Sequence, residues 1–222
     1  MAKLLGGTYH LQANEYSSSA PFEATSNACS ELDIATSEIS QTQPYGKPGG
    51  YPSLYKGCHW NDCTLDSGLP LEVSALTPGV ATTADDTTTV SGGAWDDAYD
   101  IWFNSSASGT QGTTSGLEMM VWLDQYGGVQ PAGAVVASDV VVGGNAYDVW
   151  YRGGGAAGGT VSYQLVSPVS SLSFDLAPLA ADAVSRGYLP ITWYLIDVEA
   201  GFELWHGGQG LAIRSFSVTV AP

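Results

Sequence analysis

The segment LEMMVWL at residues 117–123 decides the fold class. Successive side chains of a β-strand point to opposite faces, so one face of this segment is wholly apolar and the other presents Glu118, Met120 and Trp122. The apolar face must pack against a core. A carboxylate among apolar groups is costly to desolvate, and its simplest partner is an arginine. The chain has only three arginines, so we expect a more specific role for Glu118.

The segment WYLIDVEAGFELW at residues 193–205 has the same design. Alternation predicts one apolar face, made by every second residue from Tyr194 to Leu204. The opposite face would carry Trp193, Leu195, Asp197, Glu199, Gly201, Glu203 and Trp205. Alternation alone does not choose among the three carboxylates of this face. The glycine at its centre indicates that another part of the chain approaches the backbone closely there.

A third segment, YDIWF at residues 99–103, buries alternate residues and turns Asp100 and Trp102 the other way. If the three acidic faces line one concave sheet, they form a groove with carboxylates at its centre and aromatic rings along its floor. Such a groove suits a polysaccharide, because aromatic rings stack on sugars and two carboxyls can cleave a glycosidic bond. The alternative is a sandwich whose tryptophans belong simply to the core.

Glycine-rich turn signals recur at short intervals between segments rich in Val, Ile, Trp, Tyr and Thr. This pattern predicts many short strands in an antiparallel sandwich or barrel. All-β domains exceed 200 residues as one unit, so we expect residues 1–222 to form a single domain. Residues 175–187 differ and predict the only substantial helix, packed on the back of a sheet. Asp175 would cap it, Pro178 fits its first turn and Gly187 ends it.

The chain is strongly acidic, with 22 Asp and Glu against 6 Lys and Arg and a net charge of −16. This balance disfavours nucleic acid and anionic membrane surfaces as partners and suits a neutral substrate. No apolar run approaches the roughly 20 residues of a membrane span. Charged residues make up only 13% of the chain, and we expect a secreted protein with an uncharged polar surface. Residues 1–5 are too short for a signal peptide, which we expect to have been removed.

The chain has three cysteines, and two of them flank the short segment GCHWNDC at residues 57–63. A disulfide between Cys58 and Cys63 would close this turn and agrees with secretion. The alternative is zinc, which would need two more ligands, and only His59 and Asp62 are near. The disulfide is the preferred interpretation. Cys29 would then be a buried thiol or have its partner elsewhere.

These segments, in this order, resemble the compact β-jelly-roll endoglucanases of glycoside hydrolase family 12. EMMVWL at 118–123 is similar to the family's nucleophile strand, and AGFELW at 200–205 is similar to its acid/base strand. AYDIW at 98–102 is similar to the strand whose aspartate supports the nucleophile. YPSLYKGCH at 51–59 resembles the disulfide loop of bacterial members, and VQPAG at 129–133 resembles the loop that crosses the cleft.

The resemblance implies a jelly-roll sandwich of two antiparallel sheets, with a concave substrate cleft and one short helix on the convex side. Glu118 would be the nucleophile, Glu203 the general acid/base, and Asp100 would hydrogen-bond Glu118. Glu203 is preferred to Glu199 because it follows Ala-Gly. The resemblance implies retention of anomeric configuration through a covalent glycosyl-enzyme, without a cofactor or metal. The substrate-binding residues that it implies are Asn14, Tyr16, Trp102, Met120, Trp122, Pro131 and Trp205.

Three features depart from the family pattern. The family's Asn-x-Trp-Gly, whose tryptophan stacks on a distal sugar, reads NEYS at residues 14–17, so Tyr16 offers less stacking area. The cysteine that usually pairs with the equivalent of Cys29 is absent, which leaves Cys29 free. Glu199 stands where many members have glutamine and adds a negative charge beside the acid/base.

The expected function is retaining, endo-acting hydrolysis of β-1,4-glucan by a secreted monomer. One alternative is a xyloglucan-specific enzyme of the same fold. Another is a non-catalytic carbohydrate-binding module, a class that often holds a structural calcium. The pairs at 85–86 and 96–97 are Asp-Asp, which could bind calcium, but solvated loop residues are the preferred interpretation. Asn104 begins an N-glycosylation sequon.

Overall fold

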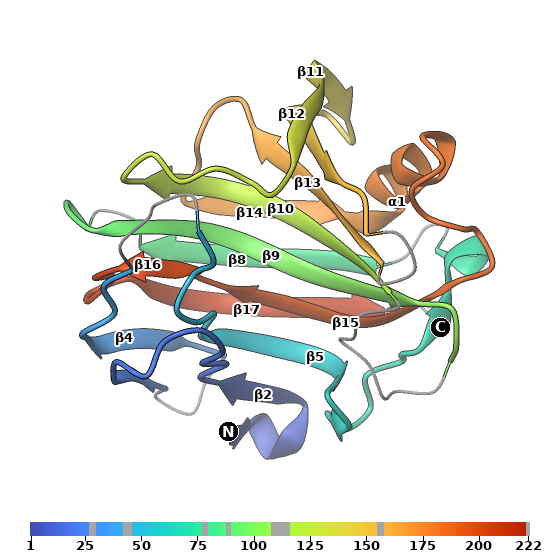
Figure 1. Cartoon of the computed structure of the whole chain (residues 1–222). Coiled ribbons are helices and arrows are strands. Elements are labelled where there is room, and N and C mark those ends of the chain that lie inside the picture. Colours follow the sequence, from blue (N-terminus) through green and yellow to red (C-terminus); the bar gives the residue numbers. More distant parts are fainter. Residues whose placement is uncertain are drawn as a thin grey trace.

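The computed structural model describes residues 1–26, 30–41, 46–76, 80–87, 90–107, 116–154 and 158–220. Within these ranges the chain forms two stacked β-sheets and one α-helix (Figure 1). Cys29 lies outside the described residues. No helix within these ranges is long and apolar enough to cross a membrane.

The larger sheet has twelve strands and carries the site. Its order is β1 (Ala2–Leu4), β2 (Tyr9–Gln12), β5 (Ser53–His59), β15 (Tyr194–Gly201), β9 (Ala94–Asn104), β10 (Leu117–Tyr126), β13 (Gly159–Leu165), β12 (Asn145–Arg152) and β11 (Ala134–Val142). Short strands β6 (Asp62–Cys63), β7 (Leu71–Glu72) and β16 (Leu204–His206) pair with β5, β15 and β9. Strands β12 and β11 rise from the plane of β9 and β10, which curves the sheet (Figure 1).

The second sheet has five strands, in the order β14 (Ser171–Asp175), β8 (Val80–Thr87), β17 (Ala212–Val220), β4 (Leu32–Ser37) and β3 (Phe22–Thr25). Two short 3-10 turns, Leu5–Gly7 and Val73–Ala75, complete the regular structure. The predicted jelly-roll sandwich is confirmed. One strand pair departs from the antiparallel pattern, because β13 pairs with β10 in parallel. The chain reaches β13 only after the hairpin of β11 and β12, and that detour sets its direction.

The predicted alternation holds along β9 and β10. Tyr99, Ile101 and Phe103 join Leu117, Met119, Val121 and Leu123 in one core with Phe216 and Val218 of the second sheet. Antiparallel pairing places Met120 opposite Asp100 and Glu118 opposite Trp102, so their side chains share the other face. The residues on that other face are the candidates for function.

The alternation predicted for residues 193–205 is wrong at its start. A β-bulge shifts the register of β15 against β9, so that Leu195 lies opposite Phe103 and Asp197 opposite Trp102. Ile196 is the extra residue, and Leu195 therefore belongs to the core instead of the acidic face. Beyond the bulge the prediction holds, and Val198, Ala200, Phe202 and Leu204 are core residues.

The predicted helix forms as α1 (Leu176–Ser185), the only α-helix in the part of the chain that the structure describes. Asp175 is its N-cap and accepts a hydrogen bond from the backbone N–H of Ala177 at 3.0 Å. Tyr163 of β13 donates from its hydroxyl to Asp182 of the helix at 2.9 Å. Because Tyr163 lies on the core side of the larger sheet, the helix covers the convex side, as predicted.

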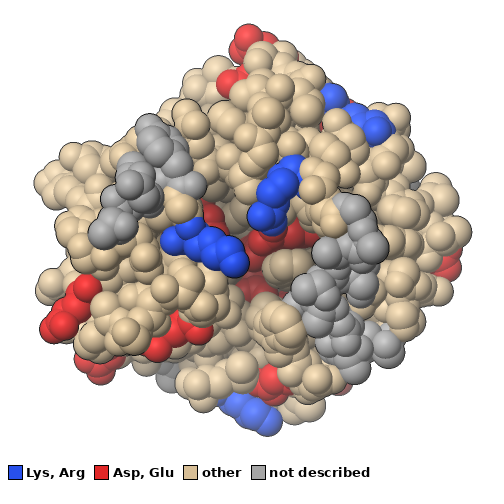
Figure 2. All heavy atoms as spheres, in the orientation of Figure 1, with Lys and Arg blue, Asp and Glu red and all other residues tan. Residues whose placement is uncertain are grey.

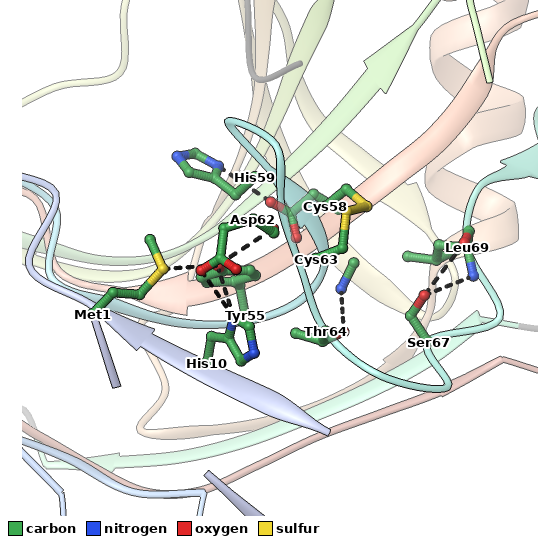
Figure 3. Close-up of a disulfide and its surroundings, with 12 residues drawn as sticks. Met1, His10, Tyr55, Cys58, His59, Asp62, Cys63, Thr64, Ser67 and Leu69 are labelled. Atoms are coloured by element: carbon green, nitrogen blue, oxygen red, sulfur yellow. Dashed lines mark hydrogen bonds and ion pairs between the residues drawn. A yellow bond between two sulfur atoms is a disulfide. The ribbon is translucent and has the colours of Figure 1, made fainter. Parts of the chain in front are cut away.

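The predicted disulfide is also confirmed, and it closes a tight hairpin between β5 and β6 (Figure 3). Asp62 is not a metal ligand here. It accepts hydrogen bonds from the hydroxyl of Tyr55 at 3.0 Å and contacts Nδ1 of His10 at 3.1 Å. The turn residues Trp60 and Asn61 both have positive φ, at 46° and 70°. The disulfide therefore holds a strained turn that presents Trp60 to solvent.

Gly57 of β5 provides a test of how tightly the site side of the sheet is packed. Its φ is 131°, and an added Cβ would lie 2.3 Å from the carbonyl oxygen of Ile196 at the bulge of β15. Gly57→Ala should therefore lower the free energy of unfolding. Gly92→Ala is the matched control, because Gly92 has a φ of 123° and open space around it. Urea unfolding should place Gly57→Ala about 2 kcal/mol or more below Gly92→Ala. Equal stabilities would contradict this close packing.

Candidate active site

The concave face of the larger sheet holds a groove of about 800 Å³. Figure 2 shows a hollow near the centre of this face with acidic atoms at its bottom and basic side chains at its rim. The groove is lined by Asn14, Tyr16, Tyr51, His59, Trp60, Asp100, Trp102, Glu118, Met120, Gln130, Pro131, Arg152, Thr160, Glu203 and Trp205, among others. The segment Gln130–Gly133, predicted to cross the cleft, lines it as well.

The structure brings together nine of the ten predicted catalytic and binding residues in this groove, and Trp122 is the exception. Trp122 is 1% exposed and packs with Met120, Val129 and Trp205. It borders a separate small hollow instead. The structure therefore does not place Trp122 in the groove, because Val129 of the loop after β10 packs against its ring. Trp205 is also largely buried, and its indole N–H donates to the carbonyl of Gly46 at 2.7 Å.

Glu118 is half-buried on β10 and has a hydroxyl donor. Thr160 of β13 lies directly opposite, and its Oγ1 donates to Oε2 of Glu118 at 2.6 Å. Arg152 of β12 donates from Nη2 to the same Oγ1 at 2.8 Å. Burial raises the pKa of Glu118 above its usual value, although the Thr160 hydrogen bond and the Arg152 charge act to lower it. The pattern of acidic segments did not identify either partner.

Glu203 lies between β15 and β16 and is tied to Asp96 of β9. Its backbone N–H donates to Oδ1 of Asp96 at 2.9 Å, and the N–H of Asp96 donates to its carbonyl at 3.1 Å. The hydroxyl of Tyr16 donates to Oε1 of Glu203 at 3.1 Å. Burial raises the pKa of Glu203 to about 7, against the lowering effect of a hydrogen bond from the Asp96 side chain. A carboxyl with such a pKa can hold a proton near neutrality and release it.

The aspartate pairs at 85–86 and 96–97 were expected to be solvated loop residues, and that expectation is wrong for the three whose side chains the structure describes. Asp86, Asp96 and Asp97 are 6%, 0% and 1% exposed and lie within strands β8 and β9. The pKa of Asp96 is raised well above its usual range by burial and then by the charge of Glu203. Burial therefore favours the protonated form of Asp96 beside Glu203, a neighbour that sequence patterns did not identify.

Asp100 lies between the two glutamates without bonding to Glu118. No hydrogen bond joins Asp100 to Glu118 among the described residues, and Oδ1 of Asp100 is buried without a partner. The expected Asp100–Glu118 hydrogen bond is thus absent. Burial and then the charge of Glu118 raise the pKa of Asp100 well above its usual range, which favours its protonated form.

The two competing carboxylates of β15 form a buried network below the floor of the groove. Glu199 accepts hydrogen bonds from Gln12 and Ser53, both at 2.7 Å. His59 Nδ1 lies 2.6 Å from Glu199 and 3.2 Å from Asp197. Burial lowers the pKa of His59, but Glu199 and Asp197 outweigh burial and raise it to about 10. His59 is therefore positively charged.

His59, Asp197 and Glu199 also form the one group of potential metal ligands found among the described residues. Their ligand atoms contact one another at the hydrogen-bond distances of an ion-paired histidine. The charge on Glu199 is retained, because His59 lowers its pKa against the effect of burial. The network therefore serves to hold β2, β5 and β15 together beneath the groove.

Trp60 is a further groove residue that alternation did not indicate. Its side chain is 57% exposed, and it stands at the tip of the disulfide-closed hairpin. An exposed indole on a rigid turn has the flat apolar surface on which a sugar ring stacks. Its position between Cys58 and Cys63 is the sequence feature from which Trp60 could have been predicted as a groove residue.

Comparisons with known proteins agree on one family. The profile of glycosyl hydrolase family 12 matches residues 7–221. A probable cellulase, Cel12b of Mycobacterium tuberculosis, is 31% identical over 156 residues, which is 70% of this chain and 99% of the relative. Endoglucanase A of Aspergillus kawachii is 29% identical over 84% of this chain and 77% of its own.

Solved structures give the same result. Endoglucanase cel12A from Rhodothermus marinus superposes with a TM-score of 0.92 at 36% identity, covering 99% of this chain and 95% of its own. A family 12 xyloglucanase from Bacillus licheniformis has a TM-score of 0.86 at 22% identity over 99% of this chain and 96% of its own. The second likeness, at such low identity, shows the common fold.

The charge of His59 predicts how stability depends on pH. An unfolded histidine has a pKa near 6.5, and that of His59 is raised to about 10 in the folded state. Its stabilising contribution is therefore complete below pH 6.5 and is lost as the pH rises to 10. His59→Gln should lower the free energy of unfolding by about 1.5–3 kcal/mol at pH 6 and by much less near pH 10.

Urea unfolding across this pH range measures the difference between wild type and variant. His206→Gln is the control, because His206 is exposed and contacts only Ser40 through its ring. A difference for His59→Gln that stays constant from pH 6 to pH 10 would contradict a charged His59.

Proposed function

The chain belongs to glycosyl hydrolase family 12, and we propose that it cleaves β-1,4-glucan internally with retention of configuration, through Glu118 and Glu203. The observation that carries this proposal is the pair of carboxyls in one groove with different surroundings. Burial raises the pKa of both glutamates, to about 7 for Glu203, but Glu118 has a hydroxyl donor and a nearby cation that act to lower its pKa. Pairs whose environments separate their pKa values divide the acid and base roles in this way.

In the first step Glu203 donates its proton to the glycosidic oxygen while Glu118 attacks the anomeric carbon. The bond to the leaving sugar breaks, and a covalent glycosyl-enzyme forms at Glu118. Esterification removes the charge of Glu118, so the pKa of Glu203 falls and Glu203 can act as a base. Glu203 then takes a proton from water, whose oxygen attacks the anomeric carbon and releases Glu118. The raised pKa of Asp100 favours its neutral form, so Asp100 adds little repulsion as the Glu118 carboxylate is freed.

Aromatic side chains along the groove support a polysaccharide substrate. Trp60, Trp102 and Tyr16 all line it and can stack on sugar rings. The groove is open and runs under the segment Gln130–Gly133, which suits attack within a chain. A binding module has no need of two glutamates held by separate donors in such a groove. We therefore favour the enzyme over the carbohydrate-binding alternative.

Two finer points belong to the same proposal. We take unbranched β-1,4-glucan and mixed-linkage glucan as the substrates, with xyloglucan as the alternative that the wide groove would admit. We also propose that the protein acts as a secreted monomer. The Cys58–Cys63 disulfide supports secretion, since such bonds persist in oxidising compartments.

The proposal is tested by reducing-end release from carboxymethylcellulose, mixed-linkage glucan and xyloglucan. Wild type should cleave the first two, and Glu118→Ala should lose at least about a thousandfold in rate because covalent catalysis is removed. Azide should restore turnover of an aryl glycoside by Glu118→Ala and give a product of inverted configuration. Cleavage of polysaccharide by Glu118→Ala at the wild-type rate would refute Glu118 as nucleophile.

Asp96 should set the alkaline side of the pH profile. Burial favours the protonated form of the Asp96 carboxyl, and this side chain lowers the pKa of Glu203. The amide of Asp96→Asn can still donate, but more weakly than a carboxyl donates to a carboxylate. The alkaline limb of kcat/KM should therefore move up by about half to one pH unit in Asp96→Asn. Asp33→Asn in the second sheet is the control, and an alkaline limb that moves down in Asp96→Asn would show that Asp96 is ionised.

A further inference from the structure

Three side chains on adjacent strands form one row across the concave face. Thr160 of β13 lies opposite Glu118 of β10 on one side and opposite Arg152 of β12 on the other. Arg152 donates from Nη2 to Oγ1 of Thr160 at 2.8 Å, and Oγ1 donates to Oε2 of Glu118 at 2.6 Å. Because the three residues are register neighbours, the sheet itself fixes their order.

The direction of the two hydrogen bonds follows from their chemistry. A guanidinium has only donors, so the Thr160 hydroxyl must accept from Arg152. The single hydroxyl hydrogen of Thr160 is then left for Glu118. Thr160 is 1% exposed, so bulk water does not compete for this hydroxyl. Its hydrogen bond to a carboxylate is charge-assisted and is strengthened by the cation behind it.

The relay leaves half of the carboxylate free. Among the residues that the structure describes, none donates a hydrogen bond to Oε1 of Glu118. A bidentate ion pair between Arg152 and Glu118 would instead occupy both carboxylate oxygens of Glu118. With Thr160 between the two side chains, the charge of Arg152 stabilises the Glu118 carboxylate, and Oε1 of Glu118 remains free to attack the anomeric carbon.

The surroundings of Glu118 make such a cation necessary. Asp100 of β9, Glu199 of β15 and Glu203 across the groove are acidic groups around it, and the hydroxyl of Tyr16 faces the same space. Arg152 and Lys47 are basic residues of the groove, in a chain with only six Lys and Arg. Arg152 is the one of the two that connects to Glu118 through a hydrogen bond.

We propose that Thr160 and Arg152 are positioning residues that keep the nucleophile Glu118 ionised and fix which of its oxygens attacks. This inference rests on the proposed role of Glu118. In this proposal the acid limb of the pH profile depends on the Thr160 hydroxyl and the exposed Arg152 cation. Both lie on strands, β13 and β12, that carry neither catalytic glutamate.

The first experiment measures kcat/KM against pH for Thr160→Val, Thr160→Ser and wild type. Val keeps the shape of Thr160 but loses the donor, so its acid limb should move up by about one pH unit and its kcat should fall about tenfold. Ser retains the hydroxyl and should restore both. KM should change little, since the hydroxyl is directed to Glu118 instead of the substrate.

The second experiment replaces Arg152 with Met and compares it with Arg214→Met. Both variants change the net charge by one, and Arg214 pairs with Asp33 on the second sheet, away from the groove. Arg152 is exposed, so its loss should leave the fold intact. Arg152→Met should move the acid limb up, and Arg214→Met should not. A carbon-detected NMR titration should show a higher pKa for the Glu118 carboxyl in Arg152→Met than in wild type.

The outcomes separate the two proposals. If Glu118→Ala is inactive while Thr160→Val and Arg152→Met keep the wild-type acid limb and the wild-type Glu118 titration, the relay is refuted and the proposed function stands. If Glu118→Ala remains fully active, the proposed function fails first. If Thr160→Val does not fold, Arg152→Met and its NMR titration still decide the inference.

Discussion

The packing of one apolar face of the larger sheet against the second sheet is the interaction on which the site depends. Tyr99 of β9 contacts Phe174 and Phe216 of the second sheet, with ring centroids 5.1 Å and 6.3 Å away. Burying this face fixes the orientation of every strand residue, since a slip of one position would expose the whole apolar set. The acidic side chains of β9, β10 and β15 are consequently forced together on the concave face.

Repulsion among these crowded carboxyls is reduced mainly because burial favours their protonated, neutral forms. Asp96, Asp97, Asp100 and Asp197 all have a pKa raised well above the usual range, chiefly by burial, which favours their neutral forms. The charge that remains is placed beside a cation. Glu199 pairs with protonated His59, and Glu118 has the relay to Arg152. The chain therefore needs few basic residues around its groove, although its net charge is −16.

Sequence alternation predicted the core face and the acidic face of the strands, because one apolar and one polar face is a local property of a strand. The family resemblance, not alternation, predicted that the acidic faces line one concave groove. Capping residues predicted the N-cap of α1, and cysteine spacing predicted the disulfide. Alternation could not predict the bulge at Ile196, since an inserted residue depends on the neighbouring strand. It did not identify Asp96 or Thr160, because their importance comes from register with strands distant in sequence. The strand pattern could not show that Trp122 is covered, because a loop decides what packs on its ring.

The different supports of the two glutamates follow from their places beside β9. Glu118 lies near the start of β10, where β9 and β13 pair with both edges of the strand and register supplies its donor. Glu203 lies past the end of β15, where regular pairing is interrupted. Asp96 replaces that pairing with two hydrogen bonds to the backbone of Glu203. One strand thus orients both carboxyls, and it leaves Glu203, the group that must both give and take a proton, beside a partner that also titrates. A nucleophile needs a fixed charge and an acid/base needs an adjustable one, and the sheet places each in the surroundings that suit it.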